Sequence, residues 1–253
     1  MNWPVESIWE SISPGLEGFT VEVLAEIDST NSELMRRVRA GQTDPVLLVA
    51  EHQTAGRGRL GRTWHDDARR DAPSVLMFSL GLPLAPSEWS GLSLAVGISI
   101  AQSLHPELRL KWPNDIWLHG RKLAGILIET ASTGTTRYAV IGVGINILAR
   151  DSTGLSTAAA WLQEMQPGTD AAGALQCVAM PLVQTVRQFE SQGFAPFQRR
   201  FNALDALAGQ QVNLSDGTHG LASGVDENGA LLVHTSTGLK KISSAEVSVR
   251  PVE

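Results

Sequence analysis

The stretch "LRLKWPNDIWLHGRKLAGILIETASTGTTRYAVIGVGINIL", residues 108–148, sets the architecture of this chain. It contains three β-rich runs, separated by short turn material at His119-Gly120 and Ser132-Thr133-Gly134. Such short turns predict an antiparallel meander. In the third run, Gly142 and Gly144 are strand glycines of the kind found where another group approaches the backbone closely.

Two strands and a helix are predicted before this meander. The short apolar runs "PVLLVA" (45–50) and "SVLMFSL" (74–80) predict buried strands. The segment "IDSTNSELMRRVRAG" (27–41) predicts a helix that begins at a capping box formed by Thr30 and Glu33. The long connection between the two strands is of the sort that usually carries function.

Further helices and a change of texture complete the pattern. An apolar helix is predicted over 87–106, and 169–206 is helical in pattern, with a kink or restart at Pro181. From Gly209 onward, short strands and turns predict a compact all-β module. We therefore expect an α+β fold with two domains, at residues 1–206 and 207–253.

The composition describes an ordinary globular protein. The chain has 253 residues, 43% of them hydrophobic, and a formal net charge of −6, which argues against a general nucleic-acid binder. The single cysteine, Cys177, excludes an internal disulfide framework and fits a reducing compartment. The sequence shows neither a signal peptide nor a membrane span. We expect a cytoplasmic protein.

The segment "QTAGRGRLGRTWHDD" (53–67) places three arginines and three glycines within Gly56–Arg62. The glycines let the backbone approach a ligand closely, and arginine forks suit carboxylate or phosphate. The Gly-Lys-Ser/Thr ending and following helix of a phosphate-binding P-loop are missing. A solvated hairpin tip or an RNA-contacting Arg/Gly segment has the same composition, so the spacing alone names no ligand.

Two lysines of the meander are candidates for contact with an anion. "KWPND" (111–115) is good turn chemistry that places Lys111 within reach of a phosphate and Asp115 where it accepts hydrogen bonds. A tight turn with an exposed lysine accounts for the same residues. Lys122 begins an apolar strand, where a lone lysine is ordinarily a snorkelling edge residue.

Several other site types are not supported by the sequence. "GVGIN" (142–146) lacks the third glycine of a dinucleotide fingerprint. The six histidines share no zinc-ligand spacing with cysteine or acidic residues. There is no Gly-x-Ser-x-Gly elbow, and Cys177 lies in an apolar helical stretch, so nucleophilic hydrolase chemistry is unsupported.

Five motifs in one order resemble those of the bacterial biotin–protein ligases, also called biotin–[acetyl-CoA carboxylase] ligases. The motifs are "DSTN" (28–31), "EHQTAGRGRLGRTW" (51–64), "LKWPNDIW" (110–117), "RKLAGILIE" (121–129) and "GVGINI" (142–147). Each is weak alone, but the ordered set is specific. The resemblance implies a mixed sheet with flanking helices, similar to class II synthetases, and a small C-terminal SH3-like β-barrel at 207–253.

The resemblance also implies a two-step reaction. Biotin's carboxylate attacks the α-phosphate of ATP to give biotinyl-5′-adenylate and pyrophosphate. A lysine of a biotin carboxyl carrier domain then attacks the adenylate, giving an amide and AMP. The implied small molecules are ATP, Mg²⁺ and biotin, without DNA or membrane partners, and the implied protein is a monomer or homodimer.

By position, the resemblance further implies site residues. The implied catalytic residues are Lys111, Arg59 and Asp115. The implied biotin-binding residues are Ser29, Thr30, Asn31, Gln53, Gly56, Arg57, Gly58, Arg59, Lys122 and Gly125. The implied ATP-binding residues are Arg57, Arg59, Arg62, Trp64, Lys111, Asn114, Lys122 and Asn146. Arg57-Gly58-Arg59 would clamp biotin and the adenylate as the loop folds over them, and Asp115 would accept from a biotin ring N–H or take a proton from the incoming ammonium.

Some features depart from the family, and two rivals remain. Only 27 residues precede Asp28, so we expect the ligase-only kind without an N-terminal DNA-binding domain. Leu60 stands where repressor-type members often have arginine, and His65-Asp66-Asp67 is unusually acidic. A lipoate/octanoate–protein ligase would share the fold and the adenylate chemistry. A non-catalytic biotin sensor that binds nucleic acid is the rival from another class, and the acidic charge counts against it.

Overall fold

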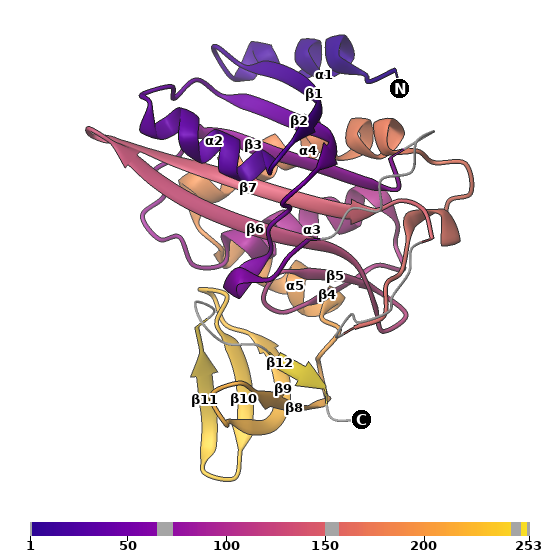
Figure 1. The fold of residues 1–253 in the computed structure, drawn as a ribbon. Helices are drawn as coiled ribbons and strands as arrows, with labels where there is room; N and C mark the ends of the chain where they lie inside the picture. Colours follow the sequence, from indigo (N-terminus) through magenta and orange to yellow (C-terminus); the bar gives the residue numbers. More distant parts are fainter. Residues whose placement is uncertain (1, 65–72, 150–156, 244–248, 252–253) are drawn as a thin grey trace.

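A seven-stranded mixed sheet forms the larger part of the protein (Figure 1). The computed structural model describes residues 2–64, 73–149, 157–243 and 249–251. The strands, in their order across the sheet, are β1 (Thr20–Ile27), β2 (Val46–Gln53), β3 (Val75–Pro83), β7 (Thr136–Asn146), β6 (Arg121–Thr133), β5 (Asp115–Leu118) and β4 (Arg109–Lys111). The β1–β2 pair is parallel and the others are antiparallel, which confirms the expected mixed sheet and the meander of β4 to β7.

Helices cover both faces of this sheet. On one face, α2 (Thr30–Arg39) buries Leu34 and Val38 against β2 and β7. The opposite face packs against α1 (Val5–Ile12), α3 (Leu92–Leu104) and α4 (Ala171–Gln192), and α5 (Gln198–Leu204) follows α4 in the chain. No helix among the described residues is both long and apolar enough to cross a membrane. The apolar strands are therefore buried on both sides.

Two details of the helices differ from expectation. The N-cap of α2 is Ser29, whose Oγ accepts from the Ser32 N–H, whereas Thr30 is already inside the helix and Glu33 pairs with Arg37. The capping box was therefore wrong. Helix α4 also runs unbroken through Pro181 and does not restart there.

The C-terminal residues form a separate five-stranded antiparallel sheet, consistent with the expected SH3-like module. In sheet order the strands are β11 (Gly238–Ile242), β10 (Leu231–Thr235), β9 (His219–Val225), β8 (Gln211–Leu214) and β12 (Val249–Pro251). Turns containing Gly217 and Gly229, both at positive φ, connect β8–β9 and β9–β10 as predicted. The boundary at 206/207 stays a prediction, because the Ala206 N–H bonds to Leu110 in the large sheet while the Gly209 N–H bonds to Ala222 in the small one.

The two sheets meet at the turn that carries the KWPND motif. The buried indole of Trp112 donates a 3.1 Å hydrogen bond to the carbonyl of Gly229 in the β9–β10 turn. The backbones at Gly229 and Gly91 approach so closely that a Cβ at Gly229 would lie 2.9 Å from the Gly91 Cα. The C-terminal module thus braces the β4–β5 turn from outside.

The acidic stretch His65-Asp66-Asp67 lies outside the residues that the structure describes, as do residues 244–248 and 252–253 of the C-terminal β module.

Candidate active site

A cavity of about 1330 Å³ lies on the α2 face of the large sheet, under the Arg/Gly loop between β2 and β3. It brings together almost every residue that the sequence singled out. Its lining includes Ser29, Thr30, Asn31, Gln53, Arg57, Gly58, Arg59, Arg62, Trp64, Lys111, Asn114, Asp115, Lys122, Gly125 and Asn146. Gly56 is the exception. It lies at the base of the loop, where its carbonyl accepts from the Trp64 N–H and a Cβ would meet the Trp64 oxygen at 2.4 Å.

One end of the cavity is polar and uncharged. Gln53 Oε1 accepts from the backbone N–H of Thr30 at 2.7 Å and from its hydroxyl at 3.2 Å. The Ser79 hydroxyl lies 2.7 Å from both Thr30 Oγ1 and Asn31 Oδ1. These four side chains are all buried, so their network fixes a rigid cluster of donors and acceptors. We call Ser29, Thr30, Asn31 and Gln53 the head group of the site.

The start of α2 is fixed from outside the cavity. Asp28 accepts from the Ser29 N–H at 2.7 Å and forms a two-pronged ion pair with Arg36. Arg36 lowers the pKa of the Asp28 carboxyl to about 2, so Asp28 is ionised at neutral pH. The first turn of α2, which carries Thr30 and Asn31, is therefore held in place by a charged pair at its end.

Glycines form the floor of the cavity. A Cβ on Gly142 would lie 2.0 Å from Asn31 Oδ1, and one on Gly144 would lie 2.4 Å from the ring of Trp64. Gly125, opposite Gly144 on β6, lies against the same ring. The predicted close approach to Gly142 and Gly144 is thus confirmed, and what approaches them is Asn31 and Trp64. The Trp64 Nε1 is buried and has no hydrogen-bond partner within the described structure.

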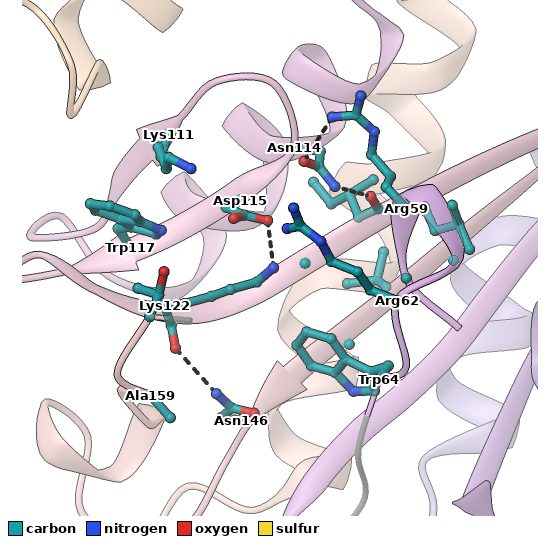
Figure 2. Close-up of a pocket in the computed structure, with 18 of the residues that line it drawn as sticks. Arg59, Arg62, Trp64, Lys111, Asn114, Asp115, Trp117, Lys122, Asn146 and Ala159 are labelled. Carbon is teal, nitrogen blue, oxygen red and sulfur yellow. Dashed lines mark hydrogen bonds and ion pairs between the residues drawn. The ribbon is translucent and has the colours of Figure 1, made fainter. Parts of the chain in front are cut away.

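The other end of the cavity is cationic (Figure 2). Lys122 Nζ lies 2.6 Å from Asp115 Oδ1 and 5.5 Å from the centre of the Trp64 ring. Lys111 Nζ lies 5.3 Å from the centre of the Trp117 ring. The register pairs Lys111 with Asp115 across β4 and β5, and a strand pair further on places Lys122 beside them. The meander itself therefore gathers these two lysines and one carboxylate.

The Arg/Gly loop adds guanidinium groups to this end. Arg59 Nη1 donates to Asn114 Oδ1 at 3.2 Å, and the Asn114 amide donates to the carbonyl of Ile126 (Figure 2). Burial lowers the pKa of Arg59 from its ordinary value, an effect that Asp115 opposes and nearby Arg62 reinforces. An arginine keeps its charge even so, and a partly desolvated charge interacts strongly with an anion. We call Arg59, Arg62, Lys111 and Lys122 the cationic group.

The side chains of Asn146 and Arg57 both pair with other parts of the protein. Asn146 is buried, and its amide donates to the carbonyls of Lys122 and Ala160, which ties β7 to the backbone beside Lys122. Arg57 points its fork at Glu129, with contacts of 2.9 and 3.1 Å. Direct contact of Arg57 with biotin and ATP remains a prediction.

Two residues that contact the predicted site residues, Ser79 and Glu129, were not predicted from the sequence. Ser79 lies in the apolar run of β3, and Glu129 closes the apolar part of β6. The signal for Ser79 was available, because a hydroxyl inside a fully buried strand needs a partner. Glu129 gave a weaker signal, since a carboxylate near a strand end is ordinarily solvated.

Comparison with known proteins assigns both sheets to known families. Residues 23–146 match the biotin/lipoate A/B protein ligase family, and residues 208–250 match the biotin protein ligase C-terminal domain. The chain is 36% identical over 248 residues to the bifunctional ligase/repressor BirA of Escherichia coli K12, covering 94% of this chain and 76% of that protein. It is 32% identical to the biotin–[acetyl-CoA-carboxylase] ligase of Paracoccus denitrificans, covering 89% and 98% of the two chains.

A solved structure agrees with these matches. The biotin protein ligase from Aquifex aeolicus, in complex with biotin and ATP, superimposes with a TM-score of 0.77 at 29% identity. The match covers 92% of this chain and 99% of that one.

Proposed function

Because the chain belongs to the biotin/lipoate A/B protein ligase family, we propose that its cavity attaches biotin to a protein lysine in two ATP-dependent steps. The enzyme activates biotin as biotinyl-5′-AMP and then transfers biotin to a carrier domain of a biotin-dependent carboxylase, such as acetyl-CoA carboxylase. One observation carries this function. A single cavity joins an uncharged polar end to a cationic end, which matches a ureido ring at one end of a substrate and a carboxylate at the other.

The head group favours biotin over lipoate or octanoate. Thr30, Asn31 and Gln53 present amide and hydroxyl groups that are buried and already mutually bonded. A ureido ring supplies two N–H donors and a carbonyl acceptor to such groups. A dithiolane or an alkyl end supplies none, so it would displace water from the remaining lone pairs and N–H groups of these side chains without replacing its hydrogen bonds.

The cationic group suits the first step. A carboxylate oxygen of biotin attacks the α-phosphorus of ATP, and the bond to the bridging oxygen breaks so that pyrophosphate leaves. Both reactants are anions, and Arg59, Lys111 and Lys122 all line the cavity in which we propose that they meet. We propose that these groups offset the repulsion and the charge that develops on the phosphate oxygens.

Mg²⁺ fits this site as an ion that enters with the nucleotide. The described residues include no cluster of three metal-ligating side chains. Mg²⁺ is commonly bound by phosphates with one or two carboxylates, and Asp115 is a carboxylate of the cavity wall. Bound there, the ion would neutralise phosphate charge.

We propose a narrower role for Asp115 than the two that the sequence allowed. Its Oδ1 contacts Lys122 at the cationic end, away from the head group. We therefore assign it the second of its two roles, accepting the proton of the incoming lysine ammonium. The freed amine attacks the carbonyl carbon of the adenylate, and AMP leaves as the amide forms.

Pyrophosphate exchange tests this function. Purified protein is given ATP and labelled pyrophosphate with biotin, lipoate or octanoate in parallel. Label entering ATP with biotin alone supports the proposal. Exchange only with lipoate or octanoate would keep the chemistry and overturn the substrate. Absence of exchange with all three would favour a non-catalytic sensor, which nucleic-acid filter binding would then test.

A further inference from the structure

The carboxylate of Glu129 contacts both a residue of the polar end of the active site and the Arg/Gly loop, although it is not among the residues that line the cavity. Glu129 lies on β6, and the alternation of side chains along a strand puts it on the same face as Gly125 and Leu127, which line the cavity. Its side chain is 22% exposed, so its hydrogen bonds form in a partly desolvated setting.

One partner of Glu129 belongs to the head group. The Asn31 amide nitrogen donates to Glu129 Oε2 at 3.0 Å and to the carbonyl of Leu127 at 3.2 Å. Both amide hydrogens of Asn31 therefore point at β6. Its Oδ1 faces Ser79 and keeps a second lone pair for a ligand N–H. The Glu129 carboxylate thus fixes the orientation of the Asn31 amide.

The other partner of Glu129 is the base of the Arg/Gly loop. Arg57 donates from Nη1 to Oε2 at 3.1 Å and from Nη2 to Oε1 at 2.9 Å, a fork-to-fork pair. Arg57 also forms a backbone bridge with Thr63, so the pair holds both arms of the loop at their root. The charge of Arg57 is offset by Glu129 and is not directed at the cationic group.

We propose that Glu129 is a positioning residue that ties the Arg/Gly loop to the biotin-head pocket through one carboxylate, with Arg57 acting as a tether and not as a clamp on the ligand. The inference rests on the proposed function for the identity of the ligand, but not for the tether itself. The Arg/Gly loop is held at its base, and it stays over the adenylate only while Glu129 contacts both Arg57 and Asn31.

Two variants and a matched control test the tether. Glu129→Gln keeps the shape but cannot pair with both neighbours, and Arg57→Met keeps much of the length of the arginine stem without its fork. Glu190→Gln is the control. The side chain of Glu190 is 26% exposed and pairs with Arg187, which is 50% exposed. These values are close to the 22% of Glu129 and the 46% of Arg57. Glu190 lies on α4 and does not line the cavity. Thermal unfolding of every variant checks that it folds.

The first assay needs no ligand. Trypsin cleaves after Arg59 and Arg62, which every variant retains, so we expect Glu129→Gln and Arg57→Met to be cut there about five-fold faster than wild type, because a charge-assisted pair is lost. Glu190→Gln should match wild type. Equal cleavage of all four proteins would overturn the inference, and so would acceleration by the control alone.

The second assay uses enzyme loaded with labelled biotin and ATP, then diluted without acceptor. We expect adenylate to leave both variants about five-fold faster, and the double variant no faster than Glu129→Gln, because the two residues act as one unit. The biotin Kd should rise in Glu129→Gln more than in Arg57→Met, since only the former disturbs Asn31. Slower release from Glu129→Gln would show that a freed Arg57 clamps the ligand, which refutes the tether. Failure of wild type to form adenylate would refute the proposed function instead, and the protease result would still decide the tether.

Discussion

Replacing Gly142 by alanine would test whether Asn31 holds the biotin head. Gly142 lies in β7 with extended backbone, so alanine suits its conformation and adds only a methyl group. That methyl carbon would lie 2.0 Å from Asn31 Oδ1 and 2.8 Å from its Cγ. Since such contacts do not persist below 3.0 Å, the amide must move by about 1 Å.

The displacement carries a definite cost. Asn31 is in the first turn of α2 and cannot slide with the helix, so its amide must rotate away from Ser79, Leu127 and Glu129. Losing two or three internal hydrogen bonds costs about 2–3 kcal/mol of folding stability. If the amide also holds the ureido ring, losing its contact with the ligand costs about 1–3 kcal/mol of binding free energy, so the biotin Kd rises about 5- to 150-fold.

Isothermal titration with biotin and, separately, with ATP measures this effect. ATP affinity should change little, because Asn31 is at the opposite end of the cavity from the cationic group. Gly15→Ala is the matched control, since a Cβ there meets nothing within 4 Å. In Gly142→Ala/Asn31→Ser, the smaller side chain makes room, so the second substitution should add no further loss. Wild-type biotin affinity in Gly142→Ala would refute the assignment of the head group.

The remaining predictions concern the joint between the sheets and the loop. Trp112→Phe should lower the free energy of unfolding by about 1–2 kcal/mol in urea denaturation, because the buried carbonyl of Gly229 loses its donor. Burial raises the pKa of Asp205 to about 6, and its Oδ2 is buried without a hydrogen-bond partner in the described structure. The folded state therefore binds more protons than the unfolded state between about pH 4 and pH 6, so stability falls as pH rises through that window. At pH 8, Asp205→Asn should raise the melting temperature, with a gain in the free energy of unfolding of at most about 3 kcal/mol. At pH 4 the substitution should leave the melting temperature unchanged. Equal effects at both pH values would contradict this explanation. Arg59→Gly loses the hydrogen bond to Asn114 and one cationic contact, so it should release adenylate roughly 100-fold faster than wild type. The released adenylate should label bystander lysines, which blotting for biotin would show. Unchanged retention of adenylate would contradict this prediction.

Local patterns predicted most of the fold. Apolar runs, turn residues and helical spacing identified the strands around the meander and the C-terminal module because each pattern acts over a few residues. The helix does not restart at Pro181 because packing stabilises it: Val178 and Leu182 are fully buried, and the carbonyl that the proline leaves unbonded belongs to the exposed Cys177. Thr30 misled because Ser29 competes for the same cap.

The sequence predicted which residues lie together at one cavity, but not which side chains pair with one another there. The motifs named residues that the meander and the loop do bring to one cavity. Which side chains pair with one another was hidden, because the decisive partners are remote in sequence. Arg57 and Glu129 are 72 residues apart, and Ser79 is 48 residues from Asn31. The composition of the loop suggests that Arg57 contacts substrate, whereas in the structure Arg57 pairs with the carboxylate of Glu129.

The brace between Trp112 and Gly229 has a consequence for biosynthesis. The two residues are 117 positions apart, so a ribosome that adds about 5–20 residues per second completes the β4–β5 turn roughly 6–23 s before its brace exists. During that interval the nascent chain carries the loop and the lysines but not the contact that holds their turn. If adenylate formation needs the braced turn, we expect it to begin only after the C-terminal module has emerged, which would limit labelling of neighbouring lysines by an incomplete enzyme on the ribosome.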